Sequence, residues 1–375
     1  MGAIERFQEV VANRHQYAQE WKQRKGGRAV GWICTYVPEE IIYAADMLPV
    51  RILGSHETQD VTDAYVSGMY CPFCRDALAQ GLKGSYGYLD GIVHARSCVH
   101  IRNTFVNWKK HVPIDFTYLM FMPAHVQSAR AKPFLTKEYA DFKEALENFG
   151  GKSISQDDLD NAIEVHNTNR RLMKQVYELR KADNPPLTGA EAMEMVIASQ
   201  LMDKAEHNEL LEQLVEELSD RNAGRETGSR LMLIGSEMDD IEFIRLVEGL
   251  NTTFVIDEHC SGTRYFWNEV IPEDDRLAAI AARYIDRPAC PPKDWPERRR
   301  LAFILELAQD YNAQGVILFQ QKFCDPHEFD IPPLQQLFTE NDIPTLFLEF
   351  DITVPWGQFR TRVEAFLETL ELELV

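Results

Sequence analysis

The sequence has no long apolar run and no excess of positive charge. None of its hydrophobic stretches approaches the roughly 18 consecutive residues that a membrane-spanning helix needs. Its N-terminus, MGAIERFQEVVANRHQYAQEWKQRKGG, lacks the apolar segment of a secretory signal. Lys and Arg number 39 against 59 Asp and Glu, which gives a net charge of −20. We therefore expect a cytoplasmic protein that binds neither nucleic acid nor a membrane.

The two common nucleotide-binding motifs are also missing. No G-x-G-x-x-G occurs, so the dinucleotide fingerprint is absent. The segment FGGKS resembles the end of a phosphate-binding loop, but Leu146 occupies the position of the first glycine and the preceding residues have helical spacing. We therefore expect no ATP site in this chain.

Cysteines are few, and their spacing excludes several kinds of site. The seven lie at positions 34, 71, 74, 98, 260, 290 and 324, too sparse for a secreted disulfide framework. A structural zinc site of paired knuckles needs more than the single CxxC in YCPFCR. A thioredoxin-type motif follows a strand directly, and VTDAYVSGMY is a poor strand. The compact C-x₂-C-x₂-C run of ferredoxins is absent as well.

Short apolar runs alternate with helical segments of 10–15 residues at both ends of the chain. RAVGWICTYV, LPVRILG, LDGIVHA and IDFTYLMFM are strand-like in the first part, and four similar runs occur after residue 228. This alternation predicts an α/β protein with two doubly wound parallel-sheet (flavodoxin/Rossmann-like) domains. We expect one N-terminal helix over about residues 4–24, a first domain over 1–134, a helical connector over 135–225 and a second domain over 226–375.

Most of the cysteines fall where such sheets bind ligands, at the carboxyl ends of the strands. Three precede a predicted helix: Cys71, Cys98 and Cys324. A helix N-terminus lowers the pKa of a thiol and favours the thiolate. Cys34 ends a strand, where a cysteine is more often a small buried hydrophobe, and Cys290 lies in the proline-rich RPACPPKDWP. The pattern indicates a metal cluster held by dispersed thiolates, with one iron left open.

Longer segments follow one another in a recognisable order along nearly the whole chain: TYVPEEIIYAADMLPVRILG, YCPFCR, LDGIVHARSCVHIRN, DEHCSGTRYFWNE, FCDPHEFDIPPLQQLFTENDIPTLFLEFD and GQFRTRVEAFLE. Together these segments resemble the benzoyl-CoA reductase and 2-hydroxyacyl-CoA dehydratase family. CSGTRYFWN resembles the benzoyl-CoA reductase branch. The resemblance implies that Cys71, Cys98 and Cys324 bind a 4Fe-4S cluster. It leaves Cys74 as a bystander or an alternative ligand.

The resemblance also implies a role for residues outside the three thiols. Cys260 lies in the segment typical of the reductase branch, near the expected substrate. Glu40 and Arg264 stand at matching positions and are candidate catalytic or pocket residues, although Glu40 could simply occupy the first turn of its helix.

By this resemblance the chain is a cluster-bearing subunit of an ATP-dependent benzoyl-CoA reductase. Its expected partners are a homologous cluster-bearing subunit, ATP-hydrolysing activator subunits, ferredoxin as electron donor, and benzoyl-CoA or a related acyl-CoA. The missing nucleotide motifs agree with an ATPase on separate subunits. Alternatives are a 2-hydroxyacyl-CoA dehydratase subunit, which eliminates water through a ketyl radical, a non-catalytic electron relay, and an α/β binding protein whose cysteines only pack.

Overall fold

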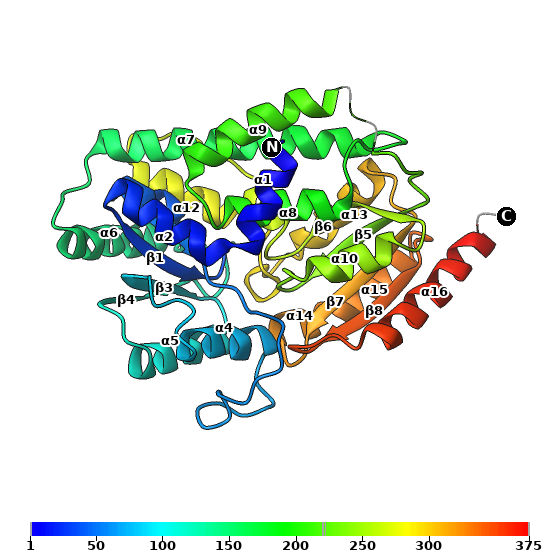
Figure 1. The fold of residues 1–375 in the computed structure, drawn as a ribbon, viewed down its shortest axis with the longest axis horizontal. Helices are drawn as coiled ribbons and strands as arrows, with labels where there is room; N and C mark the ends of the chain where they lie inside the picture. Colours follow the sequence, from blue (N-terminus) through cyan, green and yellow to red (C-terminus); the bar gives the residue numbers. More distant parts are fainter. Residues whose placement is uncertain (1, 220, 222, 374–375) are drawn as a thin grey trace.

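Two four-stranded parallel sheets with helices packed around them organise the chain (Figure 1). The structure is a computed structural model and describes residues 2–219, 221 and 223–373. The first sheet has the order β2-β1-β3-β4, and the second has the order β6-β5-β7-β8. Each sheet therefore repeats the 2-1-3-4 order of flavodoxin-like folds. The predicted α/β class with two doubly wound parallel sheets is confirmed.

The strands form where the sequence has short apolar runs. Those of the first sheet are β1 (Arg28–Ile33), β2 (Met47–Arg51), β3 (Gly91–Arg96) and β4 (Phe116–Phe121). Those of the second are β5 (Ser229–Gly235), β6 (Thr252–Glu258), β7 (Gly315–Gln321) and β8 (Thr345–Phe350). The inner strands are almost fully buried, since helices cover both faces of a parallel sheet. Of the edge strands, β2 and β6 are buried as well, whereas β4 and β8 are more exposed.

The N-terminal segment forms two helices, so the prediction of one helix over residues 4–24 was wrong. These are α1 (Ala3–Ala12) and α2 (Arg14–Lys25). Asn13 separates them with φ −116° and ψ 34°, outside the helical range. Each helix buries its own apolar residues, Phe7 and Val10 in α1 and Tyr17 and Trp21 in α2. The chain therefore changes direction at Asn13, because the buried residues of α1 and those of α2 pack on separate surfaces.

The remaining helices of the first part connect its strands. They are α3 (Glu39–Ala44), α4 (Pro72–Leu82) and α5 (Val99–His111). Pro72 occupies the first turn of α4, where its missing N–H costs no hydrogen bond. The Asp76 carboxylate accepts the backbone N–H groups of Ser55 and His56 at 2.8 Å each. This contact fixes the long segment between β2 and α4 against the helix.

Residues 131–219 form the helical part that the sequence predicts, and no strand occurs within that range. Its elements are α6 (Ala131–Gly150), α7 (Gln156–Glu178), the 3-10 turn η1 (Leu179–Lys181), α8 (Gly189–Ser199) and α9 (Lys204–Ser219). Helices α7 and α9 pack together along one side of the molecule, and α1 packs on α8 (Figure 1). The helical part thus contacts both sheet-bearing parts, and the domain boundaries at 134 and 225 remain a prediction.

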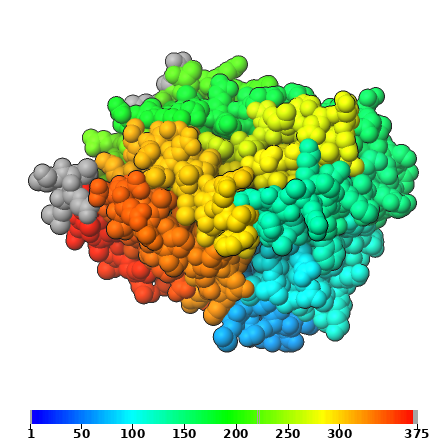
Figure 2. Space-filling model, turned by 180° about the vertical axis from the view of Figure 1, so that it is seen from behind, coloured from blue at the N-terminus to red at the C-terminus, as the bar shows by residue number. Residues whose placement is uncertain are grey.

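The second part carries the other helices. They are α10 (Ile241–Glu248), α11 (Thr263–Phe266), α12 (Arg276–Asp286), the 3-10 turn η2 (Pro291–Lys293), α13 (Arg299–Asp310), α14 (Asp325–Glu328), α15 (Ile331–Thr339) and α16 (Trp356–Glu373). Helix α12 packs against α6, where yellow and teal surfaces meet in Figure 2. Among the described helices, none is both long and apolar enough to cross a membrane.

Candidate functional site

The carboxyl edges of the two sheets face each other and are joined by buried polar contacts. Arg51, the last residue of β2, is fully buried and pairs with Glu237 after β5 at 2.5 Å. Arg75 of α4 reaches Asp351 after β8 at 2.7 Å. Ligands of such sheets bind at this edge. The candidate site is therefore the seam between the two sheets.

The first thiol at this seam belongs to Cys71, which caps the N-terminus of α4. Its backbone N–H donates to His100 Nδ1 at 3.3 Å, which ties α4 to the start of α5. A hydrogen bond with the Cys74 thiol lowers the pKa of Cys71. The same hydrogen bond, together with burial, raises the pKa of Cys74 well above its ordinary value. The thiol of Cys71 therefore ionises before that of Cys74, and the Cys74 S–H donates the hydrogen bond to the Cys71 sulfur.

Cys98 caps the N-terminus of α5, directly after β3. Its Sγ accepts the backbone N–H of Ile101 at 3.5 Å, a contact that favours a thiolate. Burial nevertheless raises the pKa of Cys98 to about 12. Without a cation or a metal, this thiol therefore stays protonated at neutral pH.

Cys324 follows β7, the strand of the second sheet that corresponds to β3. It caps the short helix α14, and its Sγ lies 3.4 Å from His327 Nδ1. Burial raises the pKa of Cys324 well above its ordinary value, and the neighbouring thiols of Cys71, Cys98 and Cys260 raise it further. Cys71 in turn acts on Cys98. The three thiols predicted as ligands therefore converge from three separate loops.

The outer thiol group (Cys71, Cys98 and Cys324) offers three thiol sulfurs, the ligand type that holds iron–sulfur clusters. Within residues 2–219, 221 and 223–373, no three His, Cys, Asp or Glu side chains lie close enough to hold one metal ion. In an iron–sulfur cluster each thiolate binds a different iron, so its ligands stand further apart. The outer thiol group could hold such a cluster, and Cys74 beside it could offer a fourth sulfur.

The other cysteines form an inner thiol group (Cys34, Cys260 and Cys290). Cys34 adopts a positive φ of 77° and lies 3.2 Å from Ser97 Oγ. Cys260 Sγ accepts from Arg264 Nη1 at 3.1 Å. Burial raises the pKa of Cys260 well above its ordinary value, and charges on Cys290 and Cys34 would raise it further. No sequence signal indicated that Cys290 would join the other two, because its loop lies outside the strand pattern.

Glu40, a candidate catalytic residue, is fully buried in the first turn of α3. It pairs with Arg170 of α7, and its Oε2 accepts from the Tyr284 hydroxyl at 3.1 Å. Burial alone would raise the pKa of Glu40, but the charge of Arg170 outweighs it and holds the pKa below its usual range. The structure therefore places Glu40 in an ion pair that joins α3 to the helical part.

Arg264, the other candidate, is 1% exposed and lies in α11 behind the seam. Its Nε and Nη2 donate to the two carboxylate oxygens of Glu258 at 2.7 Å each. Arg300 also pairs with Glu258 and reaches Asp330 with its other amino group. The charges of Arg264 and Arg300 overcome the effect of burial and lower the pKa of Glu258 to about 2. We call these four residues the charged network.

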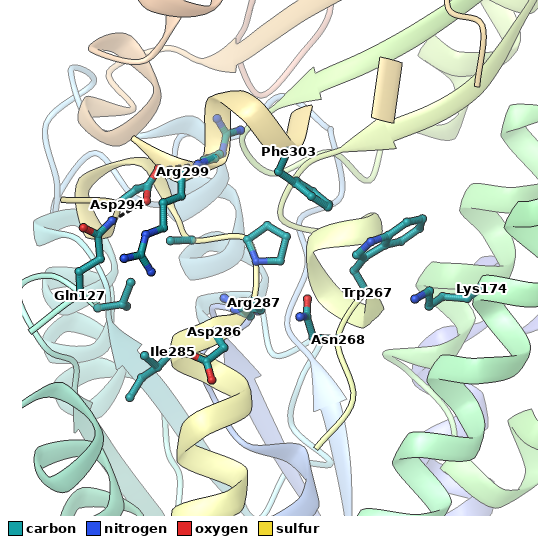
Figure 3. A pocket seen from close by; sticks show the side chains of 14 residues that line it. Gln127, Lys174, Trp267, Asn268, Ile285, Asp286, Arg287, Asp294, Arg299 and Phe303 are labelled. Carbon is teal, nitrogen blue, oxygen red and sulfur yellow. Dashed lines mark hydrogen bonds between the residues drawn. The ribbon is translucent and has the colours of Figure 1, made fainter. Parts of the chain in front are cut away.

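Two hollows open near the seam. One, of about 390 Å³, lies beside Cys98 and is lined by Arg96, Arg102, Phe121 and Lys293 among others. A larger one, of about 590 Å³, lies behind the charged network. Trp267 and Phe303 line one end of it near Lys174, and Gln127 and Asp294 line the other (Figure 3). Both hollows present cationic side chains, in contrast to the net charge of the chain.

Fold and site together define a class of protein: two flavodoxin-like sheets whose facing edges carry cysteines from separate loops. The chain belongs to the 2-hydroxyglutaryl-CoA dehydratase D-component family, whose model matches residues 34–370. This finding confirms the family predicted from the motifs.

Curated relatives are similar over almost their whole lengths. The chain is 28% identical to the (R)-phenyllactyl-CoA dehydratase beta subunit of Clostridium sporogenes, with 97% of each chain covered. It is 29% identical to the beta subunit of the (R)-2-hydroxyglutaryl-CoA dehydratase of Acidaminococcus fermentans, with 98% covered in both. It is 27% identical to a benzoyl-CoA reductase subunit of Thauera aromatica, over 95% of this chain and 94% of that one. All three are enzyme subunits by name.

Proposed function

We propose that this chain is a 4Fe-4S cluster-bearing subunit of an enzyme that acts on acyl-CoA thioesters. The observation that carries the proposal is the convergence of Cys71, Cys98 and Cys324 at the seam of a chain that belongs to this family. Each of the three thiols directly precedes a helix, and the Cys98 sulfur accepts the backbone N–H of Ile101 in the first turn of α5.

When bound, the cluster would supply single electrons at low potential. The chain's own residues have simpler tasks. Cys71, Cys98 and Cys324 would hold the cluster, and the surrounding buried side chains would exclude water. The cationic hollow beside Cys98 suits an anionic ligand, because Arg96, Arg102 and Lys293 line it in a chain of net charge −20.

The reaction that we propose is reduction of the aromatic ring of benzoyl-CoA. It is supported by similarity to a benzoyl-CoA reductase subunit and by the segment CSGTRYFWN, which contains the buried helix α11 behind the seam. Dehydration of a 2-hydroxyacyl-CoA is the second candidate, favoured by the family description and by the two dehydratase beta subunits. A homologous subunit, an ATP-hydrolysing activator and ferredoxin complete the proposed assembly.

The cluster is tested by anaerobic purification of the chain together with the products of neighbouring genes. Iron, acid-labile sulfide and the EPR spectrum of the reduced protein are measured for the wild type and for Cys98→Ser. We expect about four irons for this chain, lost in the variant. Iron-free wild type, or an unchanged spectrum in Cys98→Ser, contradicts the proposal.

The choice between the two reactions is tested by ATP consumption. The purified complex is supplied with ATP and reduced ferredoxin, and with either benzoyl-CoA or a 2-hydroxyacyl-CoA. A reductase consumes ATP with every electron transferred, whereas a dehydratase needs ATP only for activation. Ring reduction with ATP use in proportion to product supports the first candidate. Water elimination that continues without further ATP supports the second.

A further inference from the structure

His327 connects the outer thiol group to the charged network. It lies three residues after Cys324, one turn along α14, and is 3% exposed. Its Nδ1 is 3.4 Å from Cys324 Sγ, and its Nε2 is 3.3 Å from Arg264 Nη1. One side of the imidazole thus faces a thiol proposed as a ligand, and the other faces a guanidinium.

The guanidinium decides which ring nitrogen carries the proton. Arginine can only donate hydrogen bonds, so Nε2 of His327 must offer its lone pair to Arg264. The ring is then neutral, and its single proton sits on Nδ1. The Gly235 carbonyl also faces His327 and accepts from Arg264 Nη2 at 3.3 Å; its second lone pair stays open, so the tautomer is assigned from the 3.3 Å contact between Nε2 and Arg264 Nη1. A proton on Nε2 would instead point at the N–H of Arg264.

The charged network holds Arg264 in this orientation. Glu258 fixes Arg264 through both carboxylate oxygens, and Arg300 fixes Glu258 from the other side. Both arginines and the carboxylate are essentially without solvent contact. None of these charged groups can turn toward water. Arg264 therefore continues to donate to Nε2 of His327, and the Nδ1–H of His327 stays directed at Cys324.

We propose that His327 is a positioning residue whose Nδ1–H donates a hydrogen bond to the Cys324 thiolate and thereby raises the reduction potential of the cluster. This inference rests on the proposed function. Reduction adds negative charge to the cluster, and an N–H aimed at a ligand sulfur stabilises that charge. Cys71 has the Cys74 thiol and Cys98 has the Ile101 N–H as donors. Cys324 has a side-chain donor fixed by a buried charged network.

Three substitutions at position 327 separate the hydrogen bond from simple packing. His327→Leu removes both nitrogens. His327→Gln keeps a polar side chain but places its amide near the position of Nε2. His327→Asn places an amide N–H near the position of Nδ1 and restores the donor. His166→Asn is the control, since His166 is a buried histidine of α7 whose Nδ1 bonds Ala162 O at 2.8 Å.

The midpoint potential is measured by EPR-monitored redox titration of the full complex, and Cys98→Ser identifies the signal that belongs to this chain. His327→Leu and His327→Gln should lower the ratio of reduced to oxidised cluster about tenfold at a fixed potential, which is about 59 mV for one electron. His327→Asn and His166→Asn should stay within about a third of that shift. An unchanged potential in both His327→Leu and His327→Gln, or an equal shift in all three, overturns the inference.

A spectroscopic measurement tests the same hydrogen bond without depending on the stability of the variants. In protein with ¹⁵N-labelled histidine, pulsed EPR should detect a histidine nitrogen and an exchangeable proton coupled to the reduced cluster. The nitrogen coupling of His327 and one exchangeable-proton coupling should vanish in His327→Gln, while the couplings of the Cys74 and Ile101 protons remain, and the missing proton coupling should return in His327→Asn. If the wild type holds no cluster, the proposed function fails together with this inference. If a cluster is present without these couplings, only the inference fails.

Discussion

The two sheets share one strand order but use their equivalent loops differently. Cys98 follows β3 and Cys324 follows the corresponding β7, and both lie in the outer thiol group. Cys71 follows β2 and Cys260 follows the corresponding β6, and both lie near enough to Cys324 to raise its pKa, but only Cys71 is a predicted cluster ligand. Cys71 directly precedes an eleven-residue helix, whereas Cys260 lies against the guanidinium of Arg264. Equivalent topology therefore places a thiol at the seam, and the local partners decide its role.

The sharpest contrast should come from replacing the equivalent cysteines one at a time. Cys71→Ala should lose nearly all iron and activity, because a low-pKa thiolate is removed from the outer group. Cys260→Ala should keep the iron content within about a fifth of wild type. Iron analysis of anaerobically purified complexes measures both. Equal iron loss in the two variants would break the distinction between outer and inner thiols.

The charged network behind Cys260 is buried on all sides and should contribute strongly to stability. Arg300→Met leaves the carboxylates of Glu258 and Asp330 buried with fewer partners, which should cost about 3–5 kcal/mol of unfolding free energy. Arg299→Met is the matched control, since Arg299 pairs with Glu297 at the surface. It should cost less than about 0.5 kcal/mol by urea denaturation. Equal losses would show that the network contributes no more than a surface pair.

The same network predicts a dependence of stability on pH. The pKa of Glu258 is about 2 in the folded chain and about 4.3 when unfolded. Its contribution is therefore present above about pH 4.3 and is lost as the pH falls toward 2. Between pH 5 and pH 3 the wild type should lose about 1.5 kcal/mol more than Glu258→Gln. Parallel curves for the two proteins in urea denaturation would contradict this origin of acid sensitivity.

The smallest effect is expected at Cys74, the neighbour of Cys71. Its raised pKa and its donor role indicate that it stays a thiol, so Cys74→Ala should keep the cluster and most of the activity. The lost hydrogen bond should raise the pKa of Cys71 and slow cluster assembly at neutral pH. Iron content and activity after reconstitution provide the measurement. A loss as complete as that of Cys71→Ala would identify Cys74 as a ligand and favour the relay function.

The sequence predicted the parts of this site that depend on local order along the chain. Strand-like runs located the carboxyl edges, and helix starts singled out Cys71, Cys98 and Cys324. It could not predict partners distant in sequence. Glu40 pairs with a residue of α7 130 positions away, and no local pattern indicates that contact. The break at Asn13 was missed for a related reason, because two packing surfaces rather than helix propensity set it.

The origin of the three outer thiols has a mechanical consequence. Two come from the first sheet and one from the second, with the whole helical part between them in the chain. A group bound by all three thiols would cross-link the two sheet-bearing parts across a very long loop, and closing such a loop removes entropy from the unfolded chain. The protein with the group bound should then resist proteolysis within residues 131–219 better than the protein without it. Removing the group should make both sheet-bearing parts more mobile at the same time.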